Sequence, residues 1–579
     1  MKNIICGIDL GTTNSVIAYL NKGKPEALCV EDGTALLPSV VSLGETPGQL
    51  FVGRPALNRL AAFPDRTVRS VKRLMGRETS IRLGAESHSP EDISSFILRH
   101  LVDKASEALG RNIDKAVITV PAYFDDAQRR ATIRAGELAG LEVIRIINEP
   151  TAAALVYDQV SSELPPPNPY LMVYDLGGGT FDVSVLELKG EIKEVLASCG
   201  DTALGGDDFD ERLKDFFFRH LKEKTGRDLS AERALDIRLR EVAERTKIIL
   251  SDQPFALVNE VAVTSIDGEP VNLELEVSRS DFEEMTEDLV AKTISRVHEA
   301  LSEAGLAAAD IAKIVLVGGA TRMPAVQEVL SEMFARPIEH SIDPDLCVAL
   351  GATIQAGLIA GEPLGHILLD VTAHSLGVKT IDAVDPDTGE ADYFSVIIRR
   401  NSRIPASHAQ VYFTLADGQR GVEVEVYQGE SPSCSENTPV GEFYFPLQHA
   451  PAHSPVTVEF AYDREGIVHV SVDQKGTNNR KSVTLDVRKR EVQGDLEVEL
   501  SDKPINYISE KARRLMADDR LPQVMKKELA EITRSYEQAI TDGADDSKVD
   551  ELEDRLLEKI EAAEEGLEDI GQEKENPEN

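Results

Sequence analysis

Two segments of the chain are near copies of each other, and this repeat constrains the fold more than any other feature. Residues 5–20 and 171–186 each contain an apolar run, the triplet Asp-Leu-Gly, a turn of small residues and a second apolar run. Two apolar runs joined by a short turn predict a β-hairpin. The bends carry Asp9 and Asp175, and the small residues after these acids leave backbone N–H groups open to an anion. Two facing bends could hold a polyphosphate and its metal from both sides, so the repeat indicates nucleotide chemistry.

Composition excludes several classes of protein. At 579 residues the chain is too long for one hydrophobic core, so several domains are expected. Its 101 acidic and 62 basic residues give a formal net charge of −39, which argues against nucleic-acid binding. The five cysteines lack C-x-x-C spacing and are expected to be buried thiols in a reducing compartment. No apolar run has the length of a membrane span or the pattern of a signal peptide, so we expect a cytoplasmic protein.

Residues 1–360 alternate short strands rich in Val and Ile with helical stretches, a pattern that predicts α/β layers. Strands are expected at 115–120, 141–147 and 314–317, and helices at 89–109, 126–139, 231–250 and 279–304. Residues 361–371 follow as a linker with an apolar centre at 367–369.

In the rest of the chain, the pattern of apolar and polar residues changes twice. Residues 372–490 alternate apolar and polar positions between polar turns, which predicts an all-β sandwich. Its strands are expected at 394–399, 410–415, 422–427, 456–460, 468–472 and 482–487. Residues 496–575 place apolar side chains three and four positions apart, so we expect amphipathic helices there, followed by a disordered tail at 576–579.

The phosphate chemistry must differ from that of a P-loop protein, because the sequence G-x-x-x-x-G-K-[ST] is absent. Asp9 and Asp175 suit Mg²⁺ held largely through water, since this ion gives up its water reluctantly. The hydroxyls of Thr12, Thr13 and Thr180 could bind phosphate oxygens or orient an attacking water.

Five segments, in order along the chain, resemble the ATPase domain of the seventy-kilodalton heat-shock chaperones, the DnaK family. They are 7–15, 120–126, 147–154, 175–182 and 315–322. The similarity continues through 369–371, 375–377 and 427–430, and it covers nearly all of residues 1–490. The C-terminal helical region is short and ends without Glu-Glu-Val-Asp, which is most like the short-lidded HscC-type bacterial branch.

The resemblance implies a multidomain fold with an α/β actin-like ATPase domain, built from a duplicated ribonuclease-H-like unit, a β-sandwich peptide-binding domain and a short α-helical lid. It implies ATP and ADP as ligands, Mg²⁺ as the metal and K⁺ as a further candidate ion. The catalytic residues would be Lys72, Glu149, Thr180 and Asp182, and the metal residues, acting mainly through water, Asp9 and Asp175. The nucleotide-binding residues would be Asp9, Gly11, Thr12, Thr13, Asn14, Asp175, Gly177, Gly178, Gly179, Thr180, Gly205, Gly206, Glu244, Lys247, Ser251, Gly318, Gly319, Arg322 and Asp345.

The resemblance also implies that ATP controls the binding of exposed apolar segments of unfolded proteins. The peptide site would comprise Val378, Ile381, Tyr412, Leu415, Val422, Val424 and Val426, although an alternating Val/Tyr pattern predicts plain sandwich core equally well. Coupling between the domains would run through Pro121, Arg129, Arg145, Leu368, Leu369 and Asp370. A J-domain co-chaperone would contact a surface that includes Asp126, Arg145, Asn148, Thr151 and Asp370. A nucleotide exchange factor is a further candidate partner, and a monomer is expected.

The sequence departs from the family pattern at a few positions. Ile248 and Ala320 stand in the predicted nucleoside pocket where Arg and Ser are common, and the turn 382–392 is long and acidic. Ala373 and His374 replace Pro-Leu, and we expect His374 to be an exposed turn residue rather than a pH switch. Three alternatives remain open: a sugar or glycerol kinase, a filament-forming actin relative, and a holdase or exchange factor with little hydrolysis.

Overall fold

The computed structural model describes residues 4–484 except 32, 47, 161–168, 190–191, 337, 339–342, 363, 365–366, 385–390, 449, 464–466, 476 and 478. Beyond residue 484 it describes 512–513, 515–516, 521–541, 548, 552, 555–556 and 559–560. The chain divides into two compact units, Met1–Leu496 and Glu497–Asn579, which are described separately.

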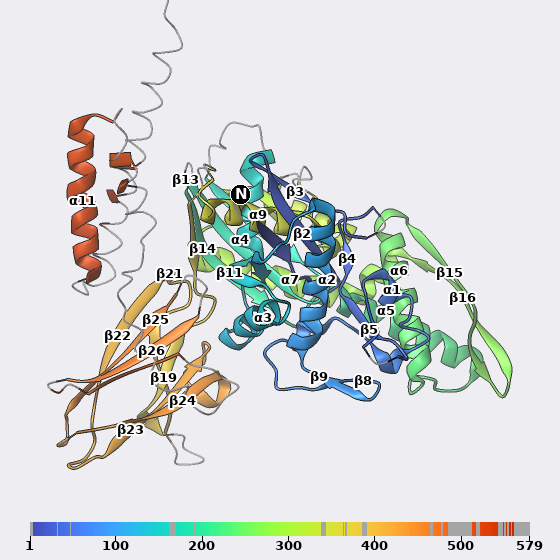
Figure 1. The fold of residues 1–579 in the computed structure, drawn as a ribbon. Coiled ribbons are helices and arrows are strands. Elements are labelled where there is room, and N and C mark those ends of the chain that lie inside the picture. Colours follow the sequence, from blue (N-terminus) through green and yellow to red (C-terminus); the bar gives the residue numbers. More distant parts are fainter. Residues whose placement is uncertain are drawn as a thin grey trace, which may run out of the picture. The chain divides into compact units, whose positions relative to one another are not determined.

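The first copy of the repeat forms the predicted hairpin. Its strands β1 (Ile5–Asp9) and β2 (Asn14–Asn21) pair antiparallel, and β10 (Lys115–Val120) lies parallel to β1 on the other side. The sheet has the order β11-β10-β1-β2-β3, with β4 also paired to β2 (Figure 1). The remaining strands of this sheet are β3 (Lys24–Ala27), β4 (Leu37–Pro38) and β11 (Glu142–Asn148).

The second copy repeats this topology in a second sheet. Strands β12 (Tyr170–Leu176) and β13 (Phe181–Lys189) form the hairpin, and β17 (Ile311–Val317) lies parallel to β12 as β10 does to β1. The sheet has the order β17-β12-β13-β14-β18-β21, so a linker strand is added at its far side. These added strands are β14 (Ile192–Asp201), β18 (Ile367–Val371) and β21 (Arg403–Ile404).

Two helices lie between the sheets and close the space behind both hairpins. Helices α4 (Glu149–Val160) and α9 (Cys347–Ile359) share one buried cluster with Val117 of β10 and Val173 of β12. The helices cross closely, because a Cβ on Gly351 would lie 1.8 Å from the carbonyl oxygen of Ala152. Strand β1 thereby packs against α9, and strands β11 and β12 pack against α4.

The outer helices begin where the sequence supplies capping residues. Ser89, Asp125 and Ser278 each accept a hydrogen bond from the third helical residue, which satisfies an otherwise free N–H group. These caps start α2 (Pro90–Leu109), α3 (Asp126–Leu138) and α7 (Arg279–Glu303), which match the predicted helices closely. The other helices of this unit are α1 (Arg54–Leu57), α5 (Gly206–Thr225), α6 (Arg233–Asp252) and α8 (Pro324–Phe334).

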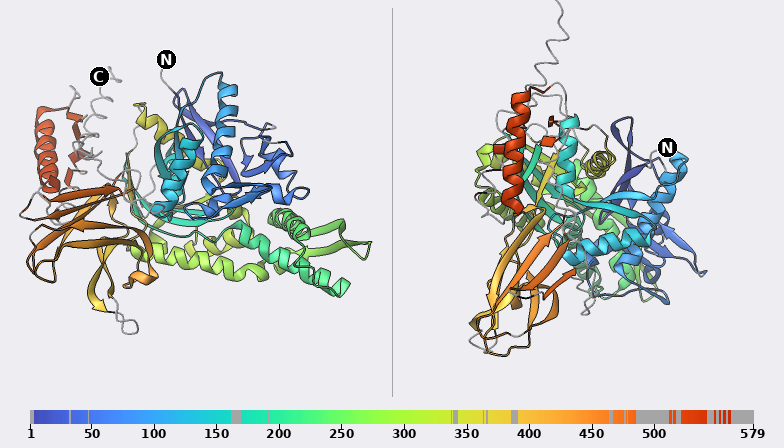
Figure 2. Two further views of the ribbon diagram at one scale, coloured as in Figure 1. Left: turned by 60° about the horizontal axis from the view of Figure 1, so that its bottom comes forward. Right: turned by 60° about the vertical axis from the view of Figure 1, so that its left-hand side comes forward.

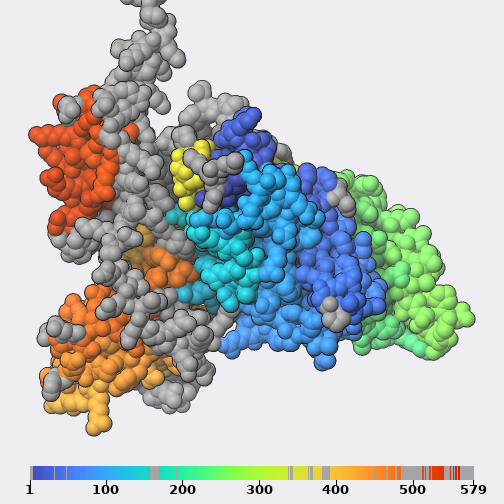
Figure 3. Space-filling view, viewed as in Figure 1, coloured from blue at the N-terminus to red at the C-terminus, as the bar shows by residue number. Residues whose placement is uncertain are grey.

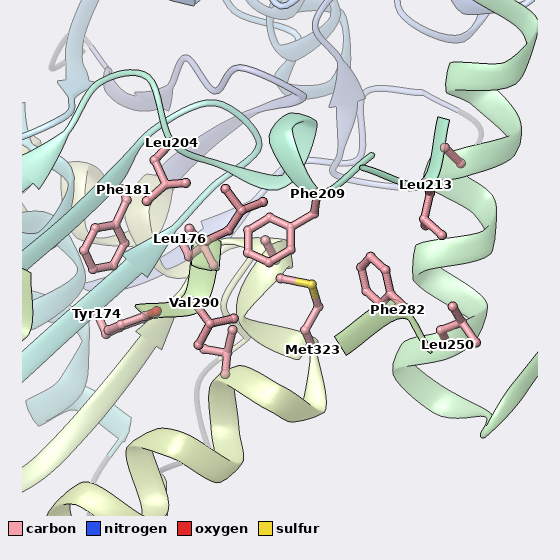
Figure 4. Packing of buried hydrophobic residues seen from close by; sticks show 14 of the residues in the cluster. Tyr174, Leu176, Phe181, Leu204, Phe209, Leu213, Leu250, Phe282, Val290 and Met323 are labelled. Atoms are coloured by element: carbon pink, nitrogen blue, oxygen red, sulfur yellow. The ribbon is translucent and has the colours of Figure 1, made fainter. Parts of the chain in front are cut away.

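The largest apolar cluster joins the second sheet to helices α5 to α8. Phe209, Leu250, Phe282 and Met323 meet at its centre, each from a different segment (Figure 4). A long hairpin of β15 (Phe255–Ile266) and β16 (Glu269–Ser278), which the sequence patterns did not predict, projects from this part (Figure 2; green in Figure 3). The small strands on the other half are β5 (Val40–Leu43), β6 (Leu50–Val52), β7 (Thr67–Arg69), β8 (Ile81–Leu83) and β9 (Glu86–His88).

Residues 376–484 form the predicted sandwich from two four-stranded sheets, of order β20-β19-β23-β24 and β22-β25-β26-β27. Buried side chains alternate with partly buried ones along β25 and β26, as expected for a sheet with one face toward the core. The strands are β19 (Leu376–Val384), β20 (Ala391–Ile398), β22 (Ala406–Phe413), β23 (Gly421–Gln428), β24 (Thr438–Pro446), β25 (Pro455–Tyr462), β26 (Val468–Gln474) and β27 (Arg480–Thr484). The sequence prediction does not include strands β19 and β24.

The second unit contains α11 (Gln523–Thr541). Its apolar face consists of Leu529, Ile532, Tyr536 and Ala539, at spacings of three and four residues, so the helix is amphipathic as predicted. Among the helices in the described part of the chain, none is long and apolar enough to cross a membrane. The tail predicted at 576–579 lies outside the described residues.

Candidate functional site

The two hairpin bends lie against one another. A Cβ on Gly178 would be 1.9 Å from the Oγ1 of Thr13, and one on Gly179 would be 2.6 Å from the Cγ2 of Thr12. The duplicated turns therefore form one site, with little room for larger residues at the glycine positions.

A third segment joins the bends at the start of α5. The backbone N–H of Gly206 donates to the carbonyl of Gly177 at 2.9 Å, and that of Asp207 donates to Gly178 at 2.8 Å. A Cβ on Gly205 would lie 2.6 Å from the carbonyl carbon of Gly178, so only glycine permits this approach. The N-terminus of α5 thus begins beside the second bend, where a helix end favours an anion.

Four carboxylates gather behind the bends, and each comes from the end of a strand or the start of a helix. Asp9 is the last residue of β1, Asp175 lies near the end of β12, Asp182 is the second residue of β13, and Glu149 is the first residue of α4. Lys72, which is 4% exposed, lies among them, and its Nζ is 2.5 Å from Oε1 of Glu149. The structure therefore brings together the acids and the lysine to which the resemblance assigned the chemistry.

Burial and mutual repulsion oppose the charged forms of these acids. Burial, followed by the charge of Glu149, raises the pKa of both Asp9 and Asp182 to about 7. Burial also raises the pKa of Asp175 well above its usual value. For Lys72, burial favours the neutral amine, but the charges of Glu149 and Asp9 outweigh this and raise its pKa. When these acids are ionised, their negative charge exceeds what one lysine can neutralise, and a divalent cation with oxygen ligands would favour the ionised forms.

Two hydrogen bonds at the cluster involve residues without a predicted role. Thr119 donates from Oγ1 to Oδ1 of Asp9 at 2.9 Å, and the backbone N–H of Tyr123 donates to Oδ1 of Asp182 at 3.0 Å. Both residues lie in or beside the recognised segment 120–126, but their partners depend on strand pairing that the sequence does not display.

The predicted nucleoside residues lie on three neighbouring segments. On α6, Lys247 pairs with Asp210 at 2.8 Å and donates to the carbonyl of Gly206 at 2.9 Å, and Ser251 donates to the carbonyl of Lys247. The guanidinium of Arg322 pairs with Asp345 at 2.7 Å, next to Gly319.

The two departures in this pocket differ in exposure. Ile248 is 58% exposed, whereas Ala320 is buried. A Cβ on Gly206 would contact both Ala320 and the Nζ of Lys247, so Ala320 lies directly beside the start of α5 at the site.

Arg69 and Arg73 form ion pairs and a hydrogen bond beside the site that were not predicted from the sequence. Arg69 contacts Asp207 at 3.6 Å and Glu244 at 3.0 Å, which joins β7 to α5 and α6. Arg73 donates to the carbonyl of Gly179 at 3.0 Å and pairs with Asp208. Residues 69–73 are thereby tied to the second half of the repeat on the side where the nucleoside residues lie.

The linker lies against the second sheet. Strand β18 pairs parallel with β14, and the carboxylate of Asp370 accepts hydrogen bonds from Asn148 at 2.8 Å and Thr151 at 3.2 Å. Arg129 donates to the side-chain oxygen of Asn148 at 2.8 Å and to the carbonyl of Ala122 at 3.0 Å.

The other predicted coupling residues are placed as follows. Pro121 accepts a hydrogen bond from the N–H of Phe124, and Leu369 and Arg145 are partly buried. The side chain of Leu368 lies outside the described residues.

The sandwich contacts the α/β region at a second place. The side chain of Asp126 accepts from the N–H of Val468 at 3.2 Å, and its own N–H donates to Gln428 at 3.4 Å. Arg400 pairs with Glu299 at 3.2 Å and Glu303 at 2.9 Å on α7. Asp126, Asn148 and Thr151, which the resemblance placed on a J-domain surface, are buried in this arrangement.

The expectation for His374 is wrong. Instead of lying exposed in a turn, its ring packs edge-on against Tyr123 with ring centroids 4.2 Å apart, and its Nε2 lies 3.2 Å from the carbonyl oxygen of Tyr123. The prediction failed because the neighbouring surface belongs to a segment about 250 positions earlier in the chain.

The predicted peptide-site residues divide between the sandwich interior and its surface. Val378, Val424 and Val426 are fully buried in the core, with Tyr412 and Val422 packed against it. Leu415 is 64% exposed, and the side chain of Ile381 lies outside the described residues. The assignment of these residues to a peptide pocket stays a prediction.

Comparison with known proteins places the chain in one family. A family model described as Hsp70 protein matches residues 5–83 and 78–579. The chain is 40% identical over 578 residues to the proteins named Chaperone protein DnaK of Thermotoga petrophila and Thermotoga maritima, covering 96% of this chain and 92% of each relative. The protein of the same name from Thermotoga neapolitana is 41% identical over 535 residues, covering 90% and 85%. This chain belongs to the Hsp70 family.

Proposed function

We propose that ATP binds between the two hairpin bends and that its hydrolysis controls how the β-sandwich holds an extended peptide. The chain is an ATP-dependent chaperone that hydrolyses ATP. The observation that carries the detailed proposal is the buried Lys72–Glu149 pair at 2.5 Å, set among Asp9, Asp175 and Asp182 where the bends meet. Such a group can neutralise phosphate charge and orient water, which phosphoanhydride hydrolysis needs more than a strong base.

Each group of residues in the site has a separate role in this proposal. Asp9 and Asp175 would hold Mg²⁺ largely through water, and that ion would supply charge neutralisation at the phosphates. Backbone N–H groups of residues 11–14 and 178–180 would cradle the phosphates, beside Gly205 and Gly206, whose own N–H groups are bonded to Asp208 and Gly177. Lys72 would contact phosphate and attacking water, while Glu149, Thr180 and Asp182 would position that water. Glu244, Lys247, Ser251 and Arg322 would bind the nucleoside.

The rival functions are not favoured. A sugar kinase or a filament-forming protein would need neither the linker strand nor residues 372–490, and the family match extends through both. A holdase without hydrolysis would not need the paired Lys72 and Glu149 of the carboxylate cluster.

The contacts of the linker and the sandwich support coupling between nucleotide and peptide. In the structure β18 pairs with β14, and Asp370 is bonded to Asn148 and Thr151. We infer that this docked linker corresponds to the ATP-bound state, in which peptide would exchange quickly. Hydrolysis would release the linker and close the sandwich on its peptide, and bound peptide would in turn stimulate hydrolysis, since coupling is reciprocal.

The partners follow from this cycle. A J-domain protein would act when the linker leaves, because Asp126, Asn148 and Thr151 are buried while the sandwich and linker are docked. We further propose an exchange factor as a partner, K⁺ beside the phosphates, a monomeric cytoplasmic protein and membership of the short-lidded HscC-type branch.

Single-turnover hydrolysis of limiting ATP, measured with and without an unfolded peptide, tests the proposal. We expect hydrolysis that peptide accelerates and that Lys72→Ala abolishes. Hydrolysis that is unaffected by peptide would contradict the coupling, and transfer of the γ-phosphate to a sugar would contradict the chaperone assignment.

A further inference from the structure

His374 lies in a rigid turn between the linker strand and the sandwich. It follows β18 and precedes β19, and its neighbours Ala373 and Ser375 are buried. The backbone N–H and the hydroxyl of Ser375 both donate to the carboxylate of Glu430 at 2.8 Å. The turn is thus fixed to the sandwich, and the imidazole projects from it onto the ATPase region.

The partner of His374 is one residue away from the catalytic cluster. The carbonyl of Tyr123 accepts the hydrogen bond from His374, and the N–H of the same residue donates to Asp182. A single residue of backbone therefore connects a catalytic carboxylate to a side chain of the sandwich. This connection is separate from the one that Asp370 makes through Asn148 and Thr151.

The surroundings of His374 select the neutral imidazole. Because a carbonyl oxygen can only accept, Nε2 must carry the hydrogen, and a second proton would have to enter at Nδ1. The groups that face the ring are the phenol ring of Tyr123 and the guanidinium groups of Arg129 on α3 and Arg400 after β20. The nearby acids are already engaged, Glu430 by Ser375 and both Glu299 and Glu303 by Arg400.

The electrostatic balance agrees with this geometry. Burial and the charges of Arg129 and Arg400 outweigh the hydrogen bond to Tyr123 and lower the pKa of His374 to about 4. In the undocked protein the ring loses these neighbours, and its pKa returns to the ordinary value of about 6.5.

We propose that His374 is a positioning residue that links docking of the sandwich to the segment holding Asp182, and that only its neutral form supports docking. The inference rests on the proposed ATP-controlled docking and adds a pH dependence to it. Protonation stabilises the undocked state, so docking weakens as the pH falls through the range in which the free imidazole titrates. Between pH 7.5 and 5.5 the docking equilibrium constant falls by about tenfold.

Hydrogen exchange of the backbone amides at 367–369 measures docking in the full-length chain with Mg²⁺ and ATP, because these residues of β18 pair with β14. Rates are corrected for the intrinsic effect of pH. We expect about tenfold less protection at pH 5.5 than at pH 7.5 in the natural protein. His374→Gln keeps a side-chain N–H donor but cannot titrate, so its protection should match at the two pH values after correction. His374→Ala should reduce protection at both.

The exposed His453 of the sandwich provides a matched control, and His453→Gln should keep the natural pH response. Thermal melting at both pH values checks that each variant is folded. An unchanged pH response in His374→Gln would overturn the inference while leaving the proposed function intact. If ATP gives the linker no protection even at pH 7.5, the proposed ATP-controlled docking fails, and the inference fails with it.

Discussion

Replacing Lys72 by Met removes a buried positive charge while keeping most of the side-chain volume. Lys72 is 4% exposed, lies 2.5 Å from Glu149 and counteracts the rise in the pKa of Asp9, Asp175 and Asp182. Removal of one preorganised charge-stabilising group lowers turnover by about 10²–10³-fold, or roughly 3–4 kcal/mol. We therefore expect the chemical step to slow by about this factor in Lys72→Met.

The same substitution should also affect folding. A buried ion pair broken on one side costs about 3–5 kcal/mol, because the remaining charge has no partner. Lys72→Met combined with Glu149→Gln should recover much of this loss, because the double variant leaves no unpaired charge of this pair buried. The free energy of unfolding, measured by denaturant titration without nucleotide, should therefore be highest for the natural protein, lower for the double variant and lowest for Lys72→Met alone.

Single-turnover hydrolysis and ADP binding by calorimetry separate chemistry from affinity. Lys104→Met on α2 provides the control, since that lysine has a 40% exposed side chain and pairs only with Glu107 among the ion pairs of the described residues. A hydrolysis rate in Lys72→Met within about threefold of the natural rate, or a double variant less stable than the single one, would refute the argument.

Three further predictions concern the metal, the phosphate loop and the linker. Because the folded pKa of Asp9 and Asp182 is raised to about 7, the folded state binds more protons than the unfolded state between about pH 4 and 7. The stability that these protonated acids contribute is therefore present at low pH and lost as the pH rises through 7. Mg²⁺ binds the ionised acids, so it should raise the melting temperature more at pH 8 than at pH 6. The difference between the two pH values should be smaller in Asp9→Asn. Gly205→Ala would place a Cβ 2.6 Å from the carbonyl carbon of Gly178 and should weaken ATP binding by about tenfold or more, measured with a fluorescent ATP analogue. Gly110→Ala, which has open space at Cβ but strains a left-handed residue (φ +61°) at the end of α2, should leave ATP binding unchanged. Asp370→Ala removes the acceptor for Asn148 and Thr151 and should weaken linker docking by about tenfold or more, seen as faster proteolysis near 367–371 with ATP; equal cleavage rates would contradict the proposed docking.

The sequence was most informative where function depends on local pattern. The apolar runs and small-residue turns around Asp9 and Asp175 predicted both hairpins, and alternation predicted the sandwich strands at 456–460 and 468–472. Short-range hydrophobic periodicity determines these elements, so no knowledge of distant partners was required. The long hairpin of β15 and β16 escaped prediction because many of its side chains are exposed, which weakens the alternation.

Contacts between distant segments could not be predicted in the same way. Thr119 reaches Asp9 only because β10 pairs parallel with β1, and Arg69 reaches Glu244 across 175 positions of sequence. The exposure of His374 depends on the docked sandwich, a property of tertiary contact rather than of the turn that contains it.

The placement of Tyr123 explains how a small change at the phosphates can reach the sandwich. In the proposed cycle, charge would leave the cluster with the cleaved phosphate, and Asp182 is the carboxylate that accepts from the N–H of Tyr123. The carbonyl of Tyr123 faces His374, and Asp126, three residues later, bonds to the backbone of Val468. Residues 121–126 therefore touch the catalytic cluster on one side and two strands or turns of the sandwich on the other. A shift of Asp182 that moves Tyr123 would break the hydrogen bond between the carbonyl of Tyr123 and His374. The imidazole would then become exposed, and its pKa would return to the ordinary value. By this linkage, the protonation of His374 and the state of the nucleotide would influence each other reciprocally.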